Sequence, residues 1–260
     1  MNIDEILSFI REGREILIPD TWAQGRTIFG GLTAAILCEA TAKETESNRK
    51  LTNFSINFIR PFETLKPFEI KVETQVNGKR VTIKSASIIQ EGKIRAAARA
   101  DYVLPLESRV IIDTFTPPQL KEKNSCIYAQ DDDWPPFFRN FDNHIATKGF
   151  PFRGPSIPEM GGWMGFKEPL NKITNSHLIC MIDSWAPTAS IYYRGAKPVS
   201  TLSWNIHFSN TGHVFLPNDH LGYLSKINFG ENGLSSSQAD IWEPGGKLLA
   251  KSFQTNIIYG

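Results

Sequence analysis

The sequence predicts an α+β protein with two copies of one unit, a helix followed by an antiparallel meander of strands. Three observations predict this class. In each half a helical apolar period gives way to strand-like alternation, turn residues separate the strands, and short segments recur about 150 residues apart. Phe54–Phe58 matches Trp204–Phe208, and Glu91–Ile94 matches Gly245–Leu248. Because both matches occur in the same order, we expect an internal duplication.

The first half begins with two predicted helices. Ile3, Ile6, Leu7 and Ile10 share one face, which predicts an amphipathic helix within residues 2–14. Gly30 and Gly31 lead into residues 32–42, an Ala-rich run that is apolar nearly all round and therefore predicts a buried central helix. Strands are then expected at residues 54–58, 68–76, 80–89 and 94–104, with hairpin turns at 77–79 and 91–92.

The second half repeats this order. We expect a helix at residues 176–185, closed by Pro187, and strands at residues 200–209, 221–229, 235–242 and 248–258. Prolines are dense between Pro105 and Pro158, which leaves room for few regular elements, while the aromatic residues there favour an ordered connection lying on the fold. The expected units are residues 1–104, the connection 105–158, and residues 159–260.

Composition narrows the class of function. With 28 Lys and Arg against 27 Asp and Glu, the net charge of +1 does not favour nucleic-acid binding. No apolar run approaches the ~20 residues of a membrane span. Three cysteines without a CxxC pair favour a reducing compartment, and acidic residues stand where a signal peptide needs positive charge. We therefore expect a cytoplasmic protein with no membrane or nucleic-acid partner.

Several catalytic motifs are missing. The spacing of Gly25 and Gly30 resembles a P-loop, but its phosphate-binding lysine is absent, which excludes that kind of nucleotide hydrolysis. There is no GxSxG nucleophile motif and no HExxH metal motif. We expect neither a metal nor another cofactor.

Four polar or thiol residues in the second half can each be interpreted either as a site residue or as an ordinary structural residue. Asp183 lies in an otherwise apolar helix, so it needs partners or a cavity, unless it is a helix-end residue facing solvent. Gln254 stands between apolar neighbours of the last strand, where it faces either the core or solvent. Thr201 opens a strand, where a threonine is usually an ordinary β-former. For Cys180 the pattern favours a buried structural cysteine over a nucleophile.

Several short motifs occur in order along the chain: Ile28-Phe-Gly-Gly31, Phe58-Ile-Arg-Pro61, Val72-Glu-Thr74, Ile89-Gln-Glu-Gly-Lys93, Gly161-Gly-Trp163, Asp183-Ser-Trp-Ala-Pro187 and Leu249-Ala-Lys-Ser-Phe-Gln254. In combination they resemble the acyl-CoA thioesterase II family. The resemblance covers nearly the whole chain except the proline-rich connection. It implies a double hotdog fold, in which two tandem helices are each wrapped by an antiparallel sheet, and this agrees with the duplication.

The resemblance also implies a reaction. Members of the family hydrolyse acyl-CoA thioesters with an Asp, a Thr and a Gln around one water, without metal or covalent intermediate. Asp183, Thr201 and Gln254 match these three positions. The thioester oxygen becomes an oxyanion during attack, and free N–H groups at a helix N-terminus stabilise such a charge. Gly30, Gly31 and Leu32 are the expected donors.

Two other functions stay open at this point. The first is a hotdog protein that binds an acyl thioester or a protein partner without catalysis. The second is an enoyl-thioester hydratase, which ranks last because neither half contains an Asp-x4-His pair. For the leading hypothesis the expected partner is acyl-CoA, or an acyl-carrier thioester, and sheet-to-sheet packing into a homodimer or higher homo-oligomer is expected.

Overall fold

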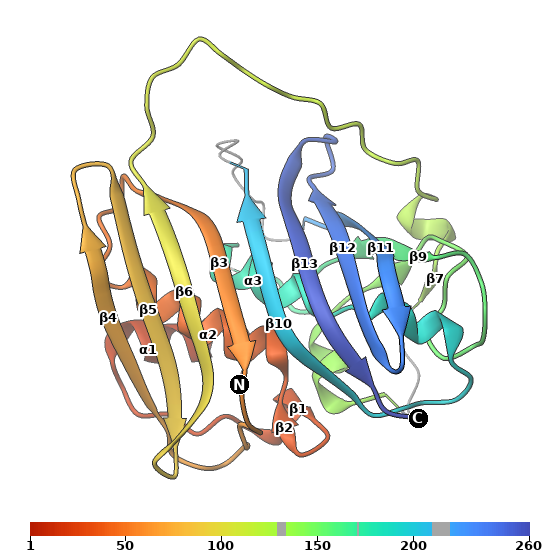
Figure 1. Cartoon of the computed structure of the whole chain (residues 1–260), viewed down its shortest axis with the longest axis horizontal. Helices are drawn as coiled ribbons and strands as arrows, with labels where there is room; N and C mark the ends of the chain where they lie inside the picture. Colours follow the sequence, from red (N-terminus) through yellow and green to blue (C-terminus); the bar gives the residue numbers. More distant parts are fainter. Residues whose placement is uncertain (129–133, 171, 210–218) are drawn as a thin grey trace.

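Most of the described strands of the computed structural model form one large antiparallel sheet, and the helices lie on one face of it (Figure 1). The structure describes residues 1–128, 134–170, 172–209 and 219–260. The sheet has 11 described strands in the order β4-β5-β6-β3-β10-β13-β12-β11-β9-β8-β7, and β1 and β2 form a separate two-stranded ribbon. These features confirm the predicted α+β class.

The elements have the following bounds. The helices are α1 (Ile3–Glu12), α2 (Gly30–Ala42) and α3 (Asn175–Ile182). The strands of the first half are β1 (Ala23–Gln24), β2 (Thr27–Ile28), β3 (Lys50–Phe58), β4 (Glu69–Asn77), β5 (Val81–Gln90) and β6 (Lys93–Val103). The others are β7 (Ile127–Tyr128), β8 (His144–Ile145), β9 (Glu159–Met164), β10 (Val199–Phe208), β11 (Leu221–Glu231), β12 (Leu234–Trp242) and β13 (Leu248–Ile258).

The two halves join through the pairing of β3 with β10. Ser55 lies opposite Asn205, Phe54 opposite Ile206, and Ile56 opposite Trp204. In the sequence repeat Phe54 corresponds to Trp204, and Ile56 corresponds to Ile206. The pairing therefore exchanges equivalent positions, as a twofold axis between Ser55 and Asn205 would do. The duplicated sequence thus builds one continuous sheet with internal pseudo-symmetry.

Helix α2 is the centre of the core. Leu32, Ile36 and Leu37 are completely buried, because α1, α3 and the inner face of the first-half strands surround the helix. A helix covered on every side needs apolar residues all round, which is the pattern of residues 32–42.

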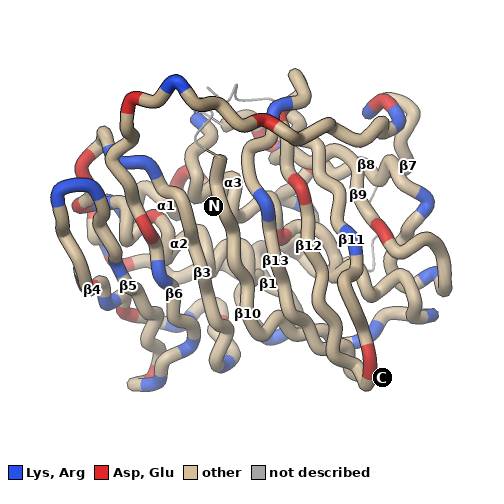
Figure 2. Tube along the Cα trace, turned by 45° about the horizontal axis from the view of Figure 1, so that its top comes forward, with Lys and Arg blue, Asp and Glu red and all other residues tan. Residues whose placement is uncertain are grey.

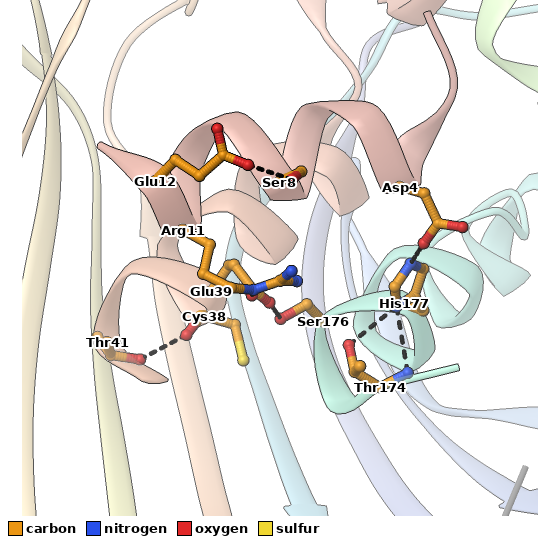
Figure 3. A network of polar contacts seen from close by, with 10 residues as sticks. All are labelled: Asp4, Ser8, Arg11, Glu12, Cys38, Glu39, Thr41, Thr174, Ser176 and His177. Carbon is orange, nitrogen blue, oxygen red and sulfur yellow. Dashed lines mark hydrogen bonds and ion pairs between the residues drawn. The ribbon is translucent and has the colours of Figure 1, made fainter. Parts of the chain in front are cut away.

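A polar network ties the three helices together (Figure 3). Glu39 of α2 accepts hydrogen bonds from Ser176 of α3 and from Arg11 of α1, each at 2.8 Å. His177 accepts the backbone N–H of Thr174 at Nδ1, so its Nε2–H is free to donate to Asp4 of α1 at 2.9 Å. These bonds fix where α3 starts, and hence where its other end lies.

The connection between the halves contributes more structure than its prolines indicate. From β6 the chain arches past one end of the sheet, and then adds the short strands β7 and β8 beyond β9 (Figure 1). Phe137 stacks on Phe29, at the start of α2, with ring centroids 4.0 Å apart. The connection is therefore part of both the sheet and the core.

The surface carries charges of both signs over both halves of the molecule (Figure 2). None of the helices in the described ranges is long and apolar enough to cross a membrane.

Candidate active site

The candidate site lies where the C-terminal end of α3 meets the N-terminal end of α2. Asp183 is the C-cap residue of α3, and it is only partly exposed. Gln254, on β13, donates from Nε2 to Asp183 Oδ1 at 2.8 Å. The backbone N–H of Gly31 donates a second hydrogen bond to the same carboxylate. The structure thus brings together three of the predicted site residues.

The two glycines at the start of α2 are required by how closely the helices approach. A Cβ on Gly30 would lie 2.9 Å from Asp183 Oδ2, and a Cβ on Gly31 would lie 2.8 Å from the backbone oxygen of Cys180. Both distances are shorter than normal contacts. Glycine at these positions lets the N-terminus of α2 reach the carboxylate.

The surroundings of Asp183 change its acidity. Burial removes water from the carboxylate and raises the pKa of Asp183 to about 7, although the hydrogen bonds from Gln254 and Gly31 lower it in part. A carboxyl group with a pKa near neutrality can both accept and release a proton at physiological pH. This is the property expected of a general base.

Thr201 lies on the same inner face of the sheet, one position further along. Its partner across the strands is Asn256, two residues after Gln254, and Asn256 Nδ2 donates to Thr201 Oγ1 at 3.0 Å. Residues i and i+2 of a strand are about 7 Å apart, so Thr201, opposite Asn256, lies about one such repeat along the sheet from Gln254. Since Thr201 Oγ1 already accepts a hydrogen bond, its own O–H is available as a donor.

The first turn of α2 supplies the candidate oxyanion donors. The first intrahelical bond there runs from the Thr33 N–H to the Phe29 carbonyl, so the N–H groups of Gly30, Gly31 and Leu32 precede the helical ladder. Gly31 uses its N–H on Asp183, as described above. The Leu32 side chain is fully buried in the core, so only the backbone of this residue can serve the site.

Other residues shape the site without a signal in the sequence. Tyr223 of β11 stacks flat on Trp185, with ring centroids 5.0 Å apart. Burial raises the pKa of the Tyr223 phenol, and the nearby Asp183 charge adds to this effect. Asn143 Nδ2 donates to Ser184 Oγ at 2.8 Å and so holds the residue next to Asp183. Asn256 shares the inner face of β13 with Gln254, two residues away, and donates to Thr201.

The structure decides between the alternatives stated for individual residues. Asp183 and Gln254 both point inward and contact each other, so neither is a solvent-facing residue. Cys180 is completely buried, and burial raises the pKa of its thiol well above the ordinary value. A thiol in that state is a poor nucleophile. Cys180 is a packing residue of α3.

These features first define a class. Two helices in tandem, each wrapped by one half of a continuous antiparallel sheet, form a double hotdog fold. The helix ends meet at a carboxylate with no described cysteine or serine nucleophile bonded to it. The family follows from two family models: the acyl-CoA thioesterase N-terminal domain matches residues 18–103, and the acyl-CoA thioesterase C-terminal domain matches residues 117–258. The chain belongs to the acyl-CoA thioesterase family and is a thioester hydrolase.

Solved structures support the fold. A hot dog fold protein of unknown function from Alicyclobacillus acidocaldarius has a TM-score of 0.85 at 17% identity, and covers 95% of this chain and 92% of its own. A putative thioesterase II from Thermobifida fusca has a TM-score of 0.81 at 18% identity, with the same coverage. An acyl-CoA thioesterase II from Mycobacterium marinum has a TM-score of 0.76 at 16% identity, covering 99% of this chain and 98% of its own. No curated protein matches the sequence significantly.

Proposed function

We propose that the protein hydrolyses acyl-CoA by direct attack of a water held among Asp183, Gln254 and Thr201. The observation that carries this proposal is the 2.8 Å hydrogen bond between Gln254 and Asp183 beside the N-terminus of α2. Asp183 Oδ1 accepts from the amide, which leaves the rest of the carboxylate to accept a proton from water. Gln254 and Thr201 would hold the water in line with the thioester carbon.

The proposed reaction has two steps. Asp183 takes a proton as the water oxygen bonds to the carbonyl carbon, and the C=O electron pair moves onto oxygen. The oxyanion then collapses, the C–S bond breaks, the proton on Asp183 passes to the departing CoA sulfur, and the acid product remains. N–H groups of the first turn of α2 stabilise the oxyanion, and the positive end of the helix dipole adds to them.

Thiol release from a panel of acyl-CoA thioesters tests this function. We expect turnover with at least one acyl chain length, and equal molar amounts of free CoA and carboxylic acid. Tight binding of acyl-CoA without thiol release would instead support the alternative of a hotdog protein that binds acyl thioesters without catalysis. Addition of water to an enoyl-CoA with the thioester intact would support the hydratase. Parallel assays with the same acyl group on acyl carrier protein decide which carrier is the substrate.

We also propose that two or more copies associate through the sheet face that is turned away from the helices. A hollow of about 230 Å³ lies there over β3, β10 and β13, and is lined by Ser55, Asn205 and Thr255 among others. Among the described side chains, the buried amide oxygens of Asn53 and Asn205 have no hydrogen-bond partner. A second copy packed face to face could satisfy such groups. Light scattering that shows a monomer at all working concentrations would refute this association.

A further inference from the structure

We propose that Asp142, His144 and His220 form a binding site for one divalent transition-metal ion, with Zn²⁺ as the best match. One ligand atom from each residue lies within 4.8 Å of the others. The three residues belong to the side of the second half where β8, β9 and β11 are neighbours. Nothing in the acyl-CoA thioesterase reaction uses them.

The backbone brings these ligands together. Asp142 and His144 stand on either side of Asn143 at the start of β8, so their side chains share one face. His220 directly precedes β11, and β9 joins the two strands by pairing with both. The Asp142 N–H also donates to the Gly165 carbonyl at 2.8 Å, and a Cβ on Gly165 would lie only 2.8 Å from His220 Nε2. Glycine at that position leaves the space that the imidazole occupies.

The side chains already converge on one carboxylate. His144 Nε2 lies 3.0 Å from Asp142 Oδ1, and His220 Nε2 lies 2.7 Å from Asp142 Oδ2. All three are half-buried, with between 15% and 24% of each side chain exposed. Two imidazole nitrogens and one carboxylate oxygen, with a fourth position left for water, are a known ligand set of Zn²⁺. Small rotations would bring these atoms to bonding distances around a shared ion.

A cation already lies at this place. The Lys123 ammonium is 2.9 Å from Asp142 Oδ2 and 2.8 Å from His220 Nε2, so it contacts two of the three proposed ligands. Lys123 comes from the connection, and 34% of its side chain is exposed, so it can swing into solvent. We infer that Lys123 competes with the metal ion for the same two atoms.

The site would have a structural role near the reaction centre. Asn143, between the proposed ligands Asp142 and His144, points the other way and holds Ser184, the neighbour of Asp183. A metal ion bound on the outside of this segment would fasten it to β11. Asp142 and His144 are close in sequence, but His220 lies far along the chain and joins them only through the pairing of β8 and β11 with β9. No spacing motif could therefore reveal the site.

Metal titration of the chelator-treated full chain tests the proposal. Zn²⁺ binding is measured by calorimetry, and Co²⁺ binding by visible absorption, for the wild type, His144→Ala, His220→Ala and Lys123→Ala. The control is His207→Ala, since His207 is exposed on β10 and far from the cluster in the sheet order. Circular dichroism and thermal unfolding confirm that each variant is folded.

We expect one ion per wild-type chain, with binding at least about tenfold weaker in His144→Ala and His220→Ala and unchanged in His207→Ala. Lys123→Ala should bind more tightly than the wild type, because its competing charge is gone. If the wild type and Lys123→Ala bind no better than His220→Ala, the cluster is only a salt bridge and the proposal is wrong. The same conclusion follows if His207→Ala loses as much affinity as His220→Ala.

Discussion

The carboxylate of Asp183 is buried between α2 and α3 and has lost much of its hydration. With a pKa near 7, the group is largely protonated in mildly acidic solution and ionised above neutrality. A general base must be ionised, so log kcat should rise with pH and level off above about pH 7. The profile is measured with a substrate whose uncatalysed hydrolysis is subtracted at every pH. A flat profile between pH 5 and 8 would contradict the assignment of Asp183 as the base.

The same shift affects stability with the opposite sense from an ordinary salt-bridged acid. The folded protein binds the proton on Asp183 more tightly than the unfolded chain does. This group therefore makes folding less favourable as pH rises from about 4, the ordinary carboxyl range, to about 7. The loss of stability over this interval should be smaller in Asp183→Asn, as thermal unfolding at several pH values would show.

The two glycines of α2 should respond differently to the same substitution. In Gly30→Ala the new methyl group presses on the Asp183 carboxylate, which can move, so turnover should fall roughly 10- to 100-fold with little loss of stability. In Gly31→Ala it meets the backbone of Cys180, which cannot move without shifting α3, so stability should fall by about 1–3 kcal/mol. Urea unfolding and steady-state kinetics of both variants separate the effects; equal stability losses would contradict this account.

Thr201 is the least directly connected of the predicted residues, so it needs its own test. Thr201→Val keeps the shape but removes the hydroxyl donor, and turnover should fall about tenfold, equivalent to ~1.4 kcal/mol for one hydrogen bond. Thr74→Val on the exposed edge strand β4 is the matched control and should keep full activity. Turnover by Thr201→Val at the wild-type level would remove Thr201 from the mechanism.

At the level of elements, strongly patterned segments could be predicted and glycine-rich ones could not. The apolar run of α2 and the alternating strands of both meanders occur within a few residues of their predicted positions. Strand β9 escaped prediction because Gly161 and Gly162 carry no strand signal. The structure explains these glycines, since a Cβ would lie 2.2 Å from the Tyr223 carbonyl oxygen and 1.8 Å from that of His144. Pairing between distant segments, not local preference, forms this strand.

The helix network supplies an element-level prediction. Glu39→Ala leaves the buried Ser176 hydroxyl and the Arg11 guanidinium without their shared acceptor (Figure 3). The free energy of unfolding should fall by about 1–3 kcal/mol. Glu12→Ala, at an exposed position of α1, is the control and should cost less than about 0.5 kcal/mol. Equal losses in the two variants, measured by urea unfolding, would show that the network adds nothing.

At the level of the whole molecule, the duplication places the site between the halves. Gly30 and Gly31 come from the first half, while Asp183 and Gln254 come from the second, and the β3–β10 pairing fixes their relation. The sequence could predict the repeat from its local pattern. It could name Asp183 and Gln254 as candidates through the family resemblance, but it left open whether they face the core or solvent. It could not predict that Asn143 supports Ser184, since that contact depends on how the connection lies against α3.

Asp183→Asn tests the central claim most directly, because it keeps the shape of the side chain and removes the proton acceptor. Turnover of the best acyl-CoA substrate should fall at least ~100-fold, while binding of acyl-CoA, measured by calorimetry, persists. The pH-dependent rise in rate near neutrality should disappear together with the activity. A folded Asp183→Asn protein that hydrolyses acyl-CoA at the wild-type rate would contradict the account of Asp183 as the base that activates water.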